Sequence, residues 1–139
     1  MNRLVCLVLL AAVGCSRTLY TTTAAQSTAA PDDALTCVHE KLKALGYDRV
    51  RHDTEARWVV YRKFDYSVKV SSGTFRRAFE LLDVRVHPEA TGTTGLEIQA
   101  HTFHQYELQR GQTDEEQSAS NNVKADAAAL AQACAQQPT

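Results

Sequence analysis

Alternating apolar and polar residues predict a β-sheet in the middle of the chain. The strongest signal covers residues 76–87, where Leu82, Val84 and Val86 alternate with polar neighbours. The pattern returns over residues 96–100, after a loop rich in Thr and Gly. We expect these two segments to form an antiparallel hairpin with one packed face and one wet face.

Three further segments carry weaker strand signals. Residues 57–64 are rich in β-branched and aromatic side chains, which favours a strand. Residues 47–52 are expected to form a short strand. In residues 66–70 apolar and polar positions alternate, which predicts another strand or hairpin arm. A turn at Ser71-Ser72-Gly73 follows.

Helical spacing of apolar residues predicts one helix before the sheet and one after it. The first covers residues 33–45. Asp32 and Asp33 should supply the N-cap and a favourable negative charge at the N-terminus of the helix, and Gly46 should end it. Its apolar stripe is formed by Leu35, Val38, Leu42 and Leu45. The second covers residues 118–135, and its apolar face contains Val123, Ala127, Leu130, Ala131 and Cys134.

This order predicts an α+β fold in one domain, residues 32–136. An antiparallel sheet of about four strands should have both helices on one face, as a two-layer sandwich. The polar stretch 105–117 is expected to be a surface loop. Residues 15–31 are rich in Thr, Ala and Ser without sustained periodicity, which predicts a flexible tether.

A separate apolar run opens the chain. It extends from Leu4 to Val13, follows the single basic residue Arg3, and ends at Gly14 and Cys15. Ten apolar residues are too few to span a bilayer, which takes about 20 helical residues. A short apolar run behind a basic start indicates a targeting segment.

The segment Ala12-Val13-Gly14-Cys15 resembles the lipobox of bacterial lipoproteins, although that family prefers Leu where this chain has Ala12. The resemblance implies a signal peptide over residues 1–14 and a membrane anchor of diacylglycerol and a further acyl chain on Cys15. Ser16, in place of the Asp that favours inner-membrane retention, implies the outer membrane of the bacterial cell envelope, facing the periplasm. The alternative is ordinary cleavage after Ala25, which would release a soluble protein.

The chain has four Cys. The resemblance assigns Cys6 to the removed segment and Cys15 to the lipid. Cys37 and Cys134 are left in a compartment where disulfides persist, and we expect them to form a bridge. Closing a loop of this size stabilises by up to about 4–5 kcal/mol in the chain-entropy model. The alternative is two free thiols.

Neither a catalytic motif nor a cofactor signature is found in the sequence, which has no nucleophile elbow, phosphate loop or dinucleotide fingerprint. His101 and His104 are three positions apart on a predicted strand, so they should point to opposite faces and not share a metal. The acidic run 114–116 fits a solvated loop or helix start. We therefore expect neither an enzyme nor a metal centre.

The uneven charge and a cluster of aromatic residues allow a binding surface, although core packing explains the aromatic residues best and an ordinary solvated surface would explain the charges. Residues 40–85 contain eleven Lys or Arg against seven acids, whereas residues 86–139 contain two against seven. The candidate surface is Trp58, Tyr61, Arg62 and Lys63, for an envelope protein or cell-wall partner. The compartment argues against nucleic acid.

The prediction is thus an envelope lipoprotein with a non-catalytic binding or scaffold domain. Its expected architecture resembles the small α+β domains of accessory lipoproteins in outer-membrane assembly machines. The alternative is a periplasmic domain that binds a ligand or peptide on the exposed sheet face.

Overall fold

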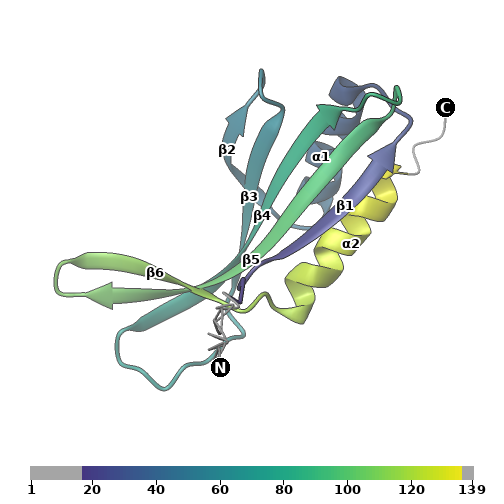
Figure 1. Ribbon diagram of the computed structural model, residues 1–139. Helices are drawn as coiled ribbons and strands as arrows, with labels where there is room; N and C mark the ends of the chain where they lie inside the picture. Colours follow the sequence, from purple (N-terminus) through teal and green to yellow (C-terminus); the bar gives the residue numbers. More distant parts are fainter. Residues whose placement is uncertain (1–16, 136–139) are drawn as a thin grey trace, which may run out of the picture.

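The computed structural model describes residues 17–135 as one sheet with two helices (Figure 1). The predicted signal peptide and Cys15 lie outside these residues. The elements, in chain order, are β1 (Thr21–Ser27), α1 (Pro31–Ala44), β2 (Asp48–Asp53), β3 (Trp58–Asp65), β4 (Phe75–Pro88), β5 (Thr94–Leu108), β6 (Gly111–Gln117) and α2 (Asn121–Ala135).

The sheet has six strands in the order β1-β5-β4-β3-β2, and every pairing is antiparallel. The long strand β5 has two partners along the same edge. Its first half pairs with β1, where Thr21 lies opposite Ala100, and its second half pairs with β6, where Gln117 lies opposite Thr102. The predicted α+β class and antiparallel sheet are confirmed, but six strands replace the expected four.

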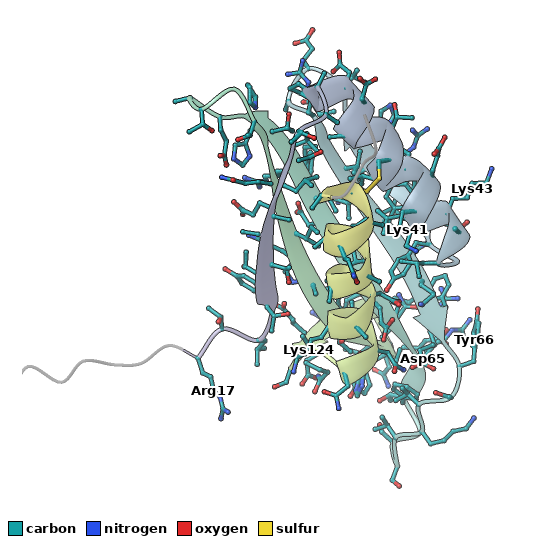
Figure 2. All side chains as sticks on the ribbon, turned by 90° about the vertical axis from the view of Figure 1, so that its right-hand side faces the viewer. Arg17, Lys41, Lys43, Asp65, Tyr66 and Lys124 are labelled. Atoms are coloured by element: carbon teal, nitrogen blue, oxygen red, sulfur yellow. A yellow bond between two sulfur atoms is a disulfide. The ribbon has the colours of Figure 1, made fainter. Side chains whose placement is uncertain are left out.

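Both helices pack on one face of the sheet, and the core lies between the two layers (Figure 2). Alternate residues of β3, β4 and β5 point inward to meet Val38 and Leu42 of α1 and Val123 and Leu130 of α2. Fully burying a Leu, Ile or Val side chain contributes about 1.5–3 kcal/mol. The inward sheet residues are Val59, Tyr61, Leu82, Val84, Val86, Leu96, Ile98 and Ala100.

The boundaries of α1 follow from its terminal residues. The N-cap is Ala30, with no side-chain cap, and Pro31 occupies the first turn, where its missing N–H matters least. Asp32 and Asp33 therefore act through charge in the first turn and not as the predicted N-cap. The chain leaves the helix at Gly46, whose φ of 87° suits glycine.

The prediction of a flexible tether is wrong for residues 21–27, because they form β1. Their inward positions, Thr21, Thr23, Ala25 and Ser27, are small or polar, so the segment lacks the apolar alternation that marks a strand. β1 lies at the sheet edge, and packing against α2 and pairing with β5 hold it there.

Two further predictions are wrong. The expected surface loop at 105–117 is the hairpin of β5 and β6, which projects away from the helices (Figure 1). The expected strand at 66–70 is part of the β3–β4 loop. The two errors have different causes. In 105–117, polar residues pair through their backbones where β5 continues beyond the core, whereas the short alternation at 66–70 has no strand partner.

Cys37 and Cys134 form the predicted disulfide, with their Cα atoms 5.7 Å apart. The bridge joins α1 to the last turn of α2, and the two helices run antiparallel (Figure 2). Within residues 17–135, neither helix is long and apolar enough to cross a membrane.

Candidate binding surface

The four residues of the predicted surface lie on β3 but do not share a face. Val59 and Tyr61 belong to the core under the helices. Because side chains alternate along a strand, Lys63 lies on the helix-covered side, whereas Trp58 and Arg62 lie on the opposite one. In the described part of the chain that opposite side carries neither helix, and we call it the helix-free face.

A row of ring side chains crosses the helix-free face over three strands. Phe64 on β3 lies 6.1 Å from Phe79 on β4, and Phe79 stacks on Phe103 of β5 at 5.1 Å between ring centroids. His101 continues the row beside Phe103 at 6.0 Å, and Tyr20 follows at 4.9 Å from His101. Aromatic pairs contribute about 0.5–1.5 kcal/mol beyond burial, so this aromatic row helps to stabilise the sheet.

Two arginines rest on the aromatic row. The guanidinium carbon of Arg77 lies 3.8 Å from the centre of the Phe64 ring, and that of Arg62 lies 4.5 Å from the same ring. Arg77 Nε also donates to Gln105 Oε1 at 2.9 Å. Neither guanidinium forms an ion pair with any residue in 17–135. Their charges are therefore held in place but not neutralised.

Trp58 lies on the same face at the start of β3, four positions before Arg62, and its polar atom is already bonded. Its indole Nε1 donates to Asp83 Oδ1 at 2.7 Å, so the ring is oriented by β4 and remains half-buried. Arg85 lies directly across from it on β4 and is exposed. Of the four predicted residues, Trp58 and Arg62 thus lie on the helix-free face, whereas Tyr61 and Lys63 do not.

Lys63 belongs instead to a polar cluster between β3, β4 and α2. Lys63 Nζ lies 2.6 Å from Asp126 Oδ2, and Tyr47 Oη donates to the same oxygen at 2.9 Å. Glu80 is only 2% exposed and accepts from Ser120 Oγ at 2.7 Å and from Tyr47 Oη at 3.3 Å. Burial, followed by the bond to Asp126 and the nearby carboxylates, raises the pKa of Tyr47 far above its usual range.

This cluster has a structural role that its bonds explain. Ser120 Oγ also accepts from the Val123 backbone N–H at 3.1 Å, so it caps the first turn of α2 while it donates to Glu80. A shallow cleft of about 320 Å³ lies beside the cluster, lined in part by Tyr66 and Asn122. Sequence reasoning missed this cluster; the sole local signal was a Ser before the Ala-rich helix.

Tyr61 takes part in a different contact, with α1. Its hydroxyl lies 2.5 Å from His39 Nδ1, at the edge of a cleft of about 420 Å³ that Lys43 and Arg49 also line. Burial, then the charges of Arg49 and His52, lower the pKa of His39. Burial raises the pKa of the Tyr61 hydroxyl.

The histidines predicted to point apart do so. His101 pairs with Leu81 on the helix-free face and its Nδ1 lies 2.6 Å from Glu116 Oε1, whereas His104 pairs with Ala78 on the other face. Among the described residues, no three His, Cys, Asp or Glu side chains are grouped to hold a metal ion.

No known protein family matches this chain, and no curated protein matches it.

Proposed function

We propose that this chain is an envelope lipoprotein, anchored through lipid on Cys15, whose domain binds a partner and carries out no chemistry. The apolar run before Cys15 and its likeness to a lipobox support the anchor. The disulfide between α1 and α2 fits an oxidising compartment outside the cytosol.

The helix-free face is the proposed binding surface, and the observation that carries it is the pair of arginines on the aromatic row. Arg62 and Arg77 lie against Phe64 without a carboxylate partner in residues 17–135. Arginine and aromatic side chains are the types that dominate binding energy at protein interfaces. Charge complementarity therefore favours an acidic surface of another envelope protein.

Crosslinking in intact cells tests this surface. A photoreactive amino acid at position 85, on the helix-free face, should capture one reproducible partner. The same probe at position 128, exposed on α2, should not. The variant Arg62→Gln/Arg77→Gln should weaken capture at position 85. The matched control Lys41→Gln/Lys43→Gln, which removes two charges from α1, should leave it intact (Figure 2).

The crosslinking results can contradict the proposed surface or the proposed class of partner. Equal capture at both positions, or capture that ignores the arginines, would contradict the proposed surface. Capture of cell-wall polymer instead of protein would contradict the partner class. The anchor is tested separately: Cys15→Ser should release the protein from membranes, and unchanged membrane fractionation would show that Cys15 does not carry the lipid.

A further inference from the structure

The distance between the proposed anchor and the folded body is short. The backbone N–H of Ala119, just before α2, donates to the Leu19 carbonyl at 2.9 Å, so the chain is already fixed to the domain at Leu19. Leu19 is four positions after Cys15. Four residues span at most roughly 14 Å when fully extended. An anchor on Cys15 would therefore hold one end of the domain against the membrane.

That end is defined by the elements that surround Arg17. The start of β1, the β3–β4 loop and the first turn of α2 lie at one end of the molecule, whereas the β2–β3 and β4–β5 turns lie at the other (Figure 1). Figure 2 shows Arg17, Tyr66 and Lys124 toward the same end, below Lys41 and Lys43 on α1. We call this end the anchor end.

The anchor end exposes apolar side chains that lie outside the hydrophobic core. Tyr66 in the β3–β4 loop is 69% exposed and Leu19 is 39% exposed. They flank the first turns of α2, since Tyr66 lines the cleft beside Asn122 and Leu19 is bonded to Ala119. Tyrosine is enriched at membrane–water interfaces, where its ring sits at the level of the headgroups.

The same end carries cations whose charge the protein does not neutralise. Arg17, Lys69 and Lys124 are exposed, and none forms an ion pair with another described residue. Three nearby acids have partners. Asp126 pairs with Lys63, Asp65 accepts from the Ser67 hydroxyl and backbone, and Glu116 lies 2.6 Å from Nδ1 of the His101 ring that contacts Tyr20. A lowered pKa keeps Asp65 ionised. Within the start of β1, the β3–β4 loop and the first turn of α2, three unpaired cations thus outnumber one unpaired carboxylate.

We infer that the anchor end seats on the membrane surface, with Tyr66 and Leu19 among the headgroups and the three cations facing anionic lipid phosphates. The inference rests on the proposed lipid at Cys15. The domain would then have a fixed orientation, and the helix-free face, which runs along the molecule, would stand to the side and stay open to a partner.

Depth-dependent fluorescence quenching tests this orientation in the acylated protein. A nitrobenzoxadiazole label is placed on Tyr66→Cys at the anchor end, or on Ala90→Cys in the β4–β5 turn at the other end. Each protein is reconstituted in phosphatidylethanolamine–phosphatidylglycerol vesicles with brominated acyl chains. Quenching is expected at position 66 and not at position 90.

The charges are tested by Arg17→Gln/Lys69→Gln/Lys124→Gln. Each cation near an anionic surface strengthens attachment roughly fivefold, so the ratio of seated to unseated protein should fall on the order of 100-fold. Quenching at position 66 should decrease accordingly. The control Lys41→Gln/Lys43→Gln/Arg51→Gln removes the same charge elsewhere and should retain the quenching. Vesicles of phosphatidylcholine alone should weaken quenching in the unmodified protein.

The experiment distinguishes a wrong membrane orientation from a wrong lipid anchor. If the protein floats with the vesicles while both labels remain equally unquenched, the anchor stands and the seated orientation is overturned. If the triple variant is quenched as strongly as its control, the lipid-phosphate contact is overturned. If the protein does not float, the proposed anchor itself is wrong.

Discussion

Lys63 Nζ lies 2.6 Å from Asp126 Oδ2, and this ion pair connects β3 to α2. The side chains are 31% and 19% exposed, so the pair is partly shielded from water. Tyr47 donates to the same carboxylate oxygen. β3, α2 and the segment before β2 thus meet at one carboxylate oxygen.

We expect Lys63 and Asp126 to be energetically coupled. Lys63→Met and Asp126→Asn should each lower the free energy of unfolding, and the double variant should lose less than the sum because the pair is already broken. The coupling should be about 1 kcal/mol. Asparagine keeps an oxygen that accepts from Tyr47, which isolates the ion pair. Urea unfolding of the four proteins measures it, and strict additivity would contradict the coupling.

The disulfide should supply a large share of the stability. Cys37→Ser/Cys134→Ser is expected to lower the free energy of unfolding by roughly 2–4 kcal/mol, because the unfolded chain regains the freedom that the bridge removes. A reductant should have the same effect on the unmodified protein and none on the variant. An unmodified protein that is insensitive to reductant would show that the bridge contributes little.

Substitutions of two neighbouring alanines test whether residues 21–27 form the strand β1. Ala25 packs against the core, whereas Ala24 points to the helix-free face and is exposed. Ala25→Asp should lower the free energy of unfolding by roughly 1–3 kcal/mol, and Ala24→Asp should change it by less than about 0.5 kcal/mol. A flexible tether would tolerate both substitutions equally.

His39 should make the fold less stable in acid. Its pKa is lowered from 6.5 in the folded protein by burial, Arg49 and His52. Between pH 6.5 and this lowered pKa the unfolded chain binds a proton that the folded chain does not. Stability is therefore complete above pH 6.5 and falls as the pH drops through the folded pKa. Thermal unfolding of the unmodified protein and of His39→Gln across this range checks it. An identical pH slope in both would rule out His39 as the cause.

Periodicity predicted the parts of the fold that bury large side chains. Leu82 and Val84 revealed β4 because their alternation faces a core. β1 left no such signal, because Thr23 and Ala25 fill its inward positions and an edge strand packs on one neighbour. A strand held mainly by backbone pairing carries little information in its side chains.

The four residues of the candidate surface fail to share one face for a related reason. Neighbours in sequence, Tyr61 and Arg62, were grouped by their residue types, but alternation sends them to opposite faces. Arg77, which completes the arginine pair, comes from β4 and is linked to Phe64 only by the register of the two strands. Such long-range pairing is not encoded by local sequence patterns.

The positions of Cys37 and Cys134 also affect how the protein is made. They are 97 residues apart, near the two ends of the domain. A growing chain lacks the native partner of Cys37 until synthesis reaches the last turn of α2. A product truncated between the two cysteines therefore keeps Cys37 as a free thiol, by which it can be distinguished from the finished protein.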